Sequence, residues 1–218
     1  HARHFSRGIL LKRLRSLTII SLLYLHACTA TPKQKNEFRE ASLQISELLR
    51  TYGIARDQAS LTYFAGLLAK LFPQGQSIKV ILLETEQPIA VSARQGVVLL
   101  SKGLLRKLPN ESCLAFIVAH EASHLTLGHY KASQPTTQER QRMELSADAA
   151  ALQLIARAGF DVSEAFVSVR YTHPRNSTDT SYPSVEARLH NLAATIRGNW
   201  PLRGQTDSRA FQRLRASL

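Results

Sequence analysis

Cysteine is scarce in this chain, since only Cys28 and Cys113 occur among its 218 residues. Two cysteines cannot build a disulfide framework, and if Cys28 is modified, Cys113 has no partner. The fold must then depend on a hydrophobic core or on a bound metal. Cys113 lies in an apolar stretch, where we expect a small buried hydrophobe rather than a reactive thiol. The length suits one well-buried domain and is short for two.

Acidic residues are also few: 16 stand against 28 basic residues, which gives a formal net charge of +12. Residues 1–27 contribute five of the basic residues and none of the acidic ones, so the rest of the chain still carries +7. The remaining Lys and Arg are scattered, and no zinc knuckle, helix-turn-helix or basic stretch interleaved with aromatics is present. We therefore expect a solvated basic surface, suited to anionic lipid or glycan, and no nucleic-acid site.

An apolar stretch long enough to span a membrane is missing. Residues 17–25 are apolar, but a transmembrane helix needs about 20 residues. This stretch follows a basic segment and leads into Leu25-His26-Ala27-Cys28. A basic segment, a short apolar segment and a small residue before the break predict a secretory signal. Its ending resembles a bacterial lipobox, in which the cysteine is lipidated; a plain signal peptide or a membrane anchor is the alternative.

The rest of the sequence predicts a mainly helical α+β domain with a small, irregular β-sheet. Apolar residues at helical spacing, ended by Gly or Pro, indicate helices, and two short apolar runs indicate strands. Residues 84–94, between the two strands, are polar and are not expected to form one. The expected helices cover residues 37–52, 60–72, 101–108, 139–158 and 184–196, with another that begins after Asn110; the expected strands are residues 78–83 and 96–100.

The helix that begins after Asn110 changes character half-way along. Residues 114–119 contain no polar side chain, so this part should run through the core. The next residues are His120, Glu121, Ala122, Ser123 and His124. Ionisable side chains are rarely found on a helix that runs through the core. Where they occur there, they tend to belong to a functional site.

These residues form an H-E-x-x-H motif. His120 and His124 are about 40° apart around a helix and one turn along it, so both imidazoles can reach one cation. Glu121 lies about 60° to the side of His124, where it can contact a metal-bound water without taking a coordination position. The motif therefore predicts a zinc site in which Glu121 is the general base.

A third ligand is expected from the following helix. Glu144 would complete a His-His-Glu site that keeps its fourth position open, as in catalytic rather than structural zinc sites. Asp148, one turn further on, can accept the second N–H of a ligand histidine. The alternative is that both are ordinary solvated helix residues. His129 lies about 140° from His124 on a continued helix, so we expect a structural or helix-terminal role for it.

Several stretches, taken in order, resemble the gluzincin metallopeptidases of peptidase family M48, the HtpX- and BepA-like enzymes related to the CAAX prenyl proteases. The matching stretches include Gly103-Leu104-Leu105, Glu111 to His124, Glu144 to Asp148 and Ala158 to Asp161. The resemblance covers about residues 36–196. It implies a zincin-like fold with the small sheet packed on the active-site helix, one zinc ion per chain, and peptide hydrolysis.

The chain departs from this family near its end. The family has His-Pro, four residues and then Arg, whereas Tyr182-Pro183 precedes Arg188 here. We interpret Tyr182 and Arg188 as candidates to stabilise the oxyanion of the transition state; the alternative for Tyr182 is packing under the Pro183 turn. We also expect a substrate polypeptide to bind as an added strand along Gly96–Leu100.

These observations predict four parts: a signal peptide over residues 1–28 that ends in a lipobox at Cys28, a tether over 29–35, an M48-like peptidase domain over 36–197 and a basic tail over 198–218. The expected function is zinc-dependent endopeptidase activity on misfolded or misassembled envelope proteins, by an outer-membrane lipoprotein on the periplasmic side. Two alternatives remain, a zinc-bound periplasmic chaperone with little proteolysis and a basic surface-binding module in which the motif is incidental.

Overall fold

The computed structural model describes residues 43, 45–93, 96–132, 134–172, 180–196 and 203–218. The chain divides into two units, residues 1–43 and 44–218, and the second contains every element described below. The predicted signal peptide, lipobox and tether lie outside the described residues. Within the described ranges, no helix is long and apolar enough to span a membrane.

The sheet has three strands, β1 (Lys79–Leu83), β2 (Ala90–Ala93) and β3 (Val97–Ser101), in the order β1-β3-β2. β3 is parallel to β1 and antiparallel to β2. Val98, Leu99 and Leu100 are fully buried, because β3 is the central strand. The expectation that a substrate strand adds along Gly96–Leu100 is therefore wrong: both edges of β3 are already paired.

The strand β2 was not predicted from the sequence. Its four residues, Ala-Val-Ser-Ala, lie in the segment that was expected to be polar and irregular. Within the described part of the chain, β2 pairs with β3 and with no other strand, so one of its edges is not covered by a strand. It packs against the helix that carries the H-E-x-x-H motif. β2 is thus the strand that faces the candidate site.

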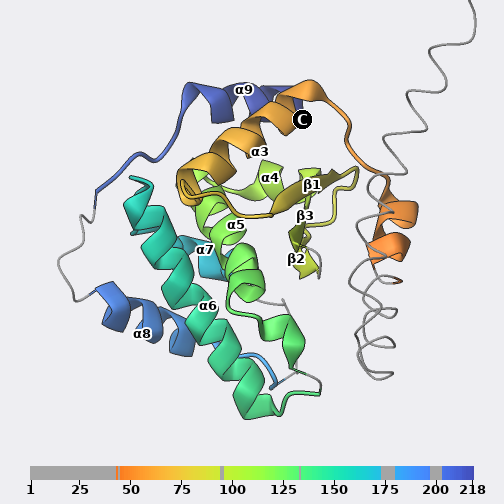
Figure 1. Cartoon of the computed structure of the whole chain (residues 1–218). Coiled ribbons are helices and arrows are strands. Elements are labelled where there is room, and N and C mark those ends of the chain that lie inside the picture. Colours follow the sequence, from red (N-terminus) through yellow and green to blue (C-terminus); the bar gives the residue numbers. More distant parts are fainter. Residues whose placement is uncertain (1–42, 44, 94–95, 133, 173–179, 197–202) are drawn as a thin grey trace, which may run out of the picture. The chain divides into compact units, whose positions relative to one another are not determined.

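The central helix is α5 (Glu111–Thr126), which carries this motif. The side chain of Asn110 caps it by accepting a hydrogen bond from the backbone N–H of Cys113 at 2.9 Å. All residues from 112 to 119 are buried, as expected for a helix that runs through the core. Figure 1 shows α5 in the middle of the unit formed by residues 44–218, with α6 (Thr137–Arg157) beside it.

Further helices cover α5 and α6. α7 (Glu164–Thr172) packs on α5, and α8 (Val185–Ile196) packs on both α6 and α7. α3 (Gln58–Leu71) contacts β1, and the short α4 (Lys102–Lys107) follows β3 directly. Residues 45–52 are also helical. The expectation of a mainly helical α+β domain with a small irregular sheet is confirmed.

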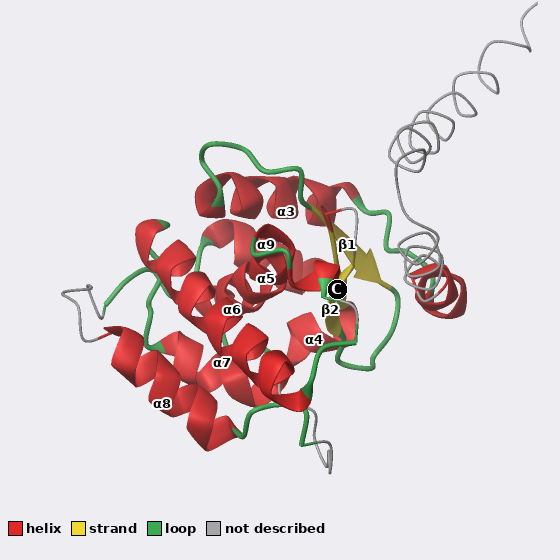
Figure 2. Ribbon diagram, turned by 60° about the horizontal axis from the view of Figure 1, so that its bottom comes forward, coloured by secondary structure: helices red, strands yellow, loops and turns green. Residues whose placement is uncertain are grey.

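The segment predicted as a basic tail, for which one or two amphipathic turns with Phe211, Leu214 and Leu218 were the alternative, contains a helix. Residues 209–217 form helix α9 (Arg209–Ser217), which lies against α3 (Figure 2). Phe211 and Leu214 of α9 are buried. Before α9, the side chain of Asp207 accepts a hydrogen bond from the first backbone N–H of α5, that of Glu111, at 2.9 Å. The described residues 203–218 therefore belong to the domain, because apolar burial and an anchored helix terminus hold them in place.

Candidate metal centre

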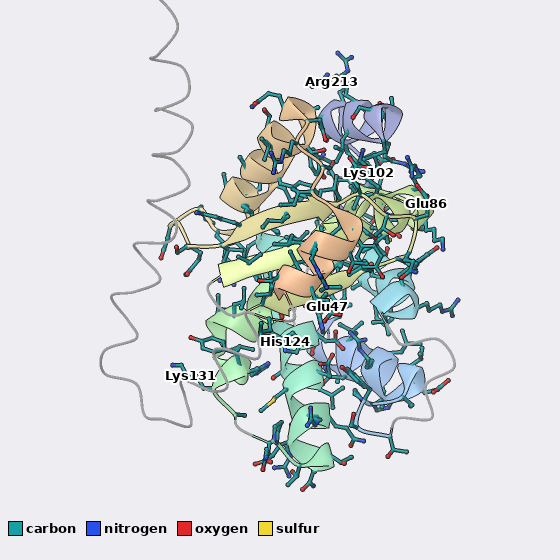
Figure 3. The ribbon with its side chains drawn as sticks, turned by 90° about the vertical axis from the view of Figure 1, so that its right-hand side faces the viewer. Glu47, Glu86, Lys102, His124, Lys131 and Arg213 are labelled. Carbon is teal, nitrogen blue, oxygen red and sulfur yellow. The ribbon has the colours of Figure 1, made fainter. Side chains whose placement is uncertain are left out.

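Three donor side chains meet where α5 leaves the core. Nε2 of His120 lies 3.1 Å from Nε2 of His124. The carboxylate of Glu144, on α6, approaches both rings: Oε2 is 3.3 Å from Nε2 of His120, and Oε1 is 3.4 Å from Nε2 of His124. His124 is labelled in Figure 3. These three residues, which the sequence placed on two helices, form a group that could hold one metal ion.

The spacing of these atoms fits zinc. Ligand atoms about 2.0–2.1 Å from a zinc ion at tetrahedral angles are separated from one another by about 3.3 Å. The three distances in this group lie between 3.1 and 3.4 Å. Two imidazoles and one carboxylate are also the donor set of catalytic zinc sites that leave one position open. The residues present therefore fit a zinc ion.

The donors line a cavity of about 370 Å³ that is open to solvent. Its walls come from β2, α5, α6 and the segment before α8: Ala90, Val91, Ser92, His120, Glu121, His124, Glu144 and Tyr182. The volume is within the range of small-molecule and peptide side-chain pockets. The three donors, His120, His124 and Glu144, are thus buried on the side of the core and accessible from the side of β2.

Glu121 lies beside the metal group and is only 9% exposed. Its carboxylate accepts hydrogen bonds from both the backbone N–H and the hydroxyl of Ser92 on β2. Burial raises the pKa of Glu121, and the nearby His120 and the bonds from Ser92 only partly oppose this rise. A carboxylate of this kind takes up a proton more readily than an exposed one, as a general base must. Ser92 was missed because its strand was not predicted.

Asp148 lies behind the first histidine. Its Oδ1 is 2.9 Å from Nδ1 of His120, although the ring N–H is not well aligned with the carboxylate, so this is a close charge contact rather than an ideal hydrogen bond. The same carboxylate accepts two bonds from Arg188, from Nη2 at 2.6 Å and from Nε at 2.8 Å. Asp148 and Arg188 are 0% and 2% exposed.

This pairing corrects the expected role of Arg188. Its guanidinium is buried against Asp148 and is not among the groups that line the cavity. It therefore supports the carboxylate that contacts His120 instead of facing an oxyanion. Burial alone would raise the pKa of Asp148, but the hydrogen bonds from Arg188 and the close contact with His120 outweigh burial and lower it, so Asp148 stays ionised.

The surroundings shift the pKa values of the two histidines in opposite directions. Burial disfavours protonation of His120, but the contacts with Asp148 and Glu144 outweigh it and raise its pKa to about 9. Burial and the charge on His120 lower the pKa of His124 to about 3. Two ring nitrogens 3.1 Å apart cannot both carry a hydrogen on the sides that face each other, so at most one proton lies between His120 and His124.

His129 lies closer to the site than the sequence predicted. α5 ends at Thr126, and Gly128 then adopts the left-handed conformation with φ of 72°. The following 3-10 turn, η2 (His129–Lys131), brings Nδ1 of His129 to 3.0 Å from Nδ1 of His124. The expected 140° separation assumed a continued helix, whereas the glycine breaks it. The sequence signal was Gly128 itself, a residue that commonly ends helices.

Tyr182 lines the cavity and is 41% exposed. Glu144 and residues 90–92 of β2 line the same cavity. Its role as an oxyanion donor stays a prediction.

Two family models match the chain. The model described as Peptidase family M48 matches residues 68–139, which include all three strands of the sheet and the H-E-x-x-H motif. The model described as Peptidase U49 matches residues 111–199, which include both histidines, Glu144, Asp148 and Arg188. A search of curated proteins gave no match.

The fold and these matches define a metallopeptidase. Together, the two matches support membership of the M48 family.

The buried pair of Arg188 and Asp148 leads to a prediction about stability. Arg188→Leu leaves the Asp148 carboxylate in the core without its guanidinium, so we expect the free energy of unfolding of the metal-free protein to fall by about 3–5 kcal/mol. Urea denaturation followed by circular dichroism measures it. Arg170→Leu, which removes an exposed guanidinium from α7, should change stability by less than about 0.5 kcal/mol. Equal losses in the two variants would contradict the structural role of the pair.

Proposed function

We propose that this metallopeptidase is a zinc-dependent endopeptidase that hydrolyses peptide bonds of misfolded or misassembled envelope proteins. The observation that carries the proposal is the spacing of the three donor atoms, 3.1 to 3.4 Å apart, beside a buried carboxylate that is not one of them. A structural zinc site would use a fourth protein ligand. Here no fourth His, Cys, Asp or Glu of the described residues joins the three donors, and all three line the cavity that Glu121 and β2 also line.

Within this proposal, His120, His124 and Glu144 hold the zinc ion. A zinc ion bound there supplies a Lewis acid that lowers the pKa of water and polarises a carbonyl group. The Glu121 carboxylate accepts the proton of the attacking water and returns it to the leaving nitrogen. Burial and the hydrogen bonds from Ser92 keep this carboxylate in one position during both transfers. Asp148, held by Arg188, orients the ring of His120.

The proposed path of the substrate is the edge of β2 that no strand of the described residues covers, in place of Gly96–Leu100. Ala90, Val91 and Ser92 line the cavity. An extended peptide that pairs with this edge would make backbone hydrogen bonds that do not depend on its sequence. Such binding suits unfolded polypeptides, because a folded substrate does not offer an extended strand. It also places a peptide bond next to the metal group and Glu121.

The first test separates metal binding from hydrolysis. Glu121→Gln keeps the shape of the side chain and all three donors, so purified protein should still contain about one zinc ion per chain. Its rate on an unfolded polypeptide such as casein should fall by about 10²–10⁴, because the proton acceptor is lost. His124→Ala should lose both zinc and activity. Elemental analysis and a cleavage assay measure these two quantities.

The outcomes distinguish the readings left open by the sequence. Cleavage by Glu121→Gln at the wild-type rate would contradict the assignment of the base. A wild-type protein that binds zinc and unfolded polypeptide but does not cleave it would favour a zinc-bound chaperone. A wild-type protein without zinc would refute the proposed metal site.

A second test concerns Tyr182. We propose that its hydroxyl donates a hydrogen bond to the oxyanion of the transition state, since it lines the cavity and a phenol with a pKa near 10 is a protonated donor at neutral pH. Tyr182→Phe should lower kcat by about 10²–10³ with unchanged zinc content. Tyr52→Phe, which removes a hydroxyl bonded to Gln87 instead, is the matched control. Equal rates for wild type and Tyr182→Phe would favour simple packing.

The proposed location rests on the sequence of the first 28 residues alone. We propose that Cys28 is lipidated and holds the domain on the periplasmic side of the outer membrane. Thr29, rather than Asp, follows Cys28, which favours the outer membrane in an enteric-type bacterium. Mass spectrometry of the mature protein from bacterial membranes should find an N-terminal cysteine that carries lipid. A mature N-terminus elsewhere, without added lipid mass, would contradict it.

A further inference from the structure

His129 makes two contacts that the hydrolytic mechanism does not use. One ring nitrogen, Nδ1, lies 3.0 Å from Nδ1 of His124. The other, Nε2, lies 3.3 Å from the hydroxyl oxygen of Ser146 on α6. The hydroxyl of Ser146 in turn donates to the backbone carbonyl of Met143 at 2.9 Å. His129 thus connects a proposed zinc ligand on α5 to the helix that supplies the third ligand.

The position of His129 depends on the turn that precedes it. Gly128 has φ of 72°, a conformation that residues with a side chain rarely adopt. This turn interrupts the helical path after α5, and the ring of His129 then lies edge-on against His124 with centroids 4.9 Å apart. A continued helix would carry the ring away from the site. The glycine and the histidine are therefore parts of one local arrangement.

The contacts allow only one arrangement of hydrogens when His124 holds a metal. Nε2 of His124 faces His120 and Glu144, so it must present its lone pair, and the hydrogen of the neutral ring then lies on Nδ1. The facing Nδ1 of His129 must accept this hydrogen. The hydrogen of His129 consequently lies on Nε2 and points to Ser146, whose own hydrogen is directed at Met143. Every donor in this series has one acceptor.

We propose that His129 is a positioning residue: its Nδ1 accepts the Nδ1–H of His124 and so fixes the ring orientation and the tautomer that leave Nε2 for the metal. The proposal rests on the proposed function as a zinc peptidase. It gives each ligand histidine its own support, Asp148 for His120 and His129 for His124. Because His129 is neutral when it accepts, it orients His124 without adding a negative charge to a site that already contains Glu121, Glu144 and Asp148.

Zinc affinity, measured by competition with a chelator, tests this role. His129→Leu removes the acceptor and should weaken zinc binding by about 10–100-fold. His129→Asn places a carbonyl oxygen near the position of Nδ1 and should keep most of the affinity. His190→Leu, which removes an exposed histidine on α8, is the matched control and should bind zinc as wild type does.

A second measurement reads the hydrogens directly and does not depend on a variant that folds. Nitrogen-15 NMR of the histidine rings in the zinc-loaded wild-type protein should show a protonated Nδ1 on His124, and an unprotonated Nδ1 with a protonated Nε2 on His129. A metal-bound nitrogen on His129, or a hydrogen on its Nδ1, would overturn the proposal. So would equal zinc affinity of His129→Leu and His190→Leu.

The two proposals fail in different ways. If wild-type protein binds no zinc, the proposed function fails and the role of His129 fails with it. If wild-type protein binds zinc tightly and His129→Leu binds it equally well, the role of His129 is refuted while the metal site stands.

Discussion

The buried carboxylate of Asp148 holds three helices together. It comes from α6, contacts His120 of α5 and accepts two hydrogen bonds from Arg188 of α8. A carboxylate that is 0% exposed must be paired, because an isolated charge in the core costs several kcal/mol. The requirement to satisfy this one group therefore sets the relative positions of α5, α6 and α8. It also fixes Glu144 one turn before Asp148 on α6, and with it the third corner of the metal group.

The same constraint explains how the site combines a rigid interior with an open face. On the inner side, His120 is supported by a buried ion pair and by a helix without polar residues over 114–119. On the outer side, β2 supplies Ser92 to hold Glu121 and leaves an edge beside the cavity. His129, after the Gly128 turn, supports the more exposed histidine. Burial thus orients the donors, and the edge of β2 beside the cavity is where we propose that a polypeptide binds.

Local pattern was sufficient to predict which side chains meet in the candidate metal group. The spacing of His120 and His124 is a property of one helix, and Glu144 and Asp148 share one face of the next, so helical periodicity places all four. Three features depended on contacts that a sequence does not contain. β2 is four residues of modest β propensity that become a strand only by pairing with β3. Arg188 was expected to face the substrate, but the buried charge of Asp148 holds it. His129 contacts the site because the left-handed Gly128 ends the helix, whereas a continued helix would direct it away.

A crystal structure of the zinc-loaded protein, with data collected at the zinc absorption edge, tests the central claim most directly. The account predicts one anomalous peak per chain, about 2.0–2.2 Å from Nε2 of His120, Nε2 of His124 and an oxygen of Glu144, with no protein atom in the fourth position. A peak coordinated by His129, by Cys113 or by a fourth protein side chain would contradict it. So would the absence of zinc from these three donors in crystals grown with the metal.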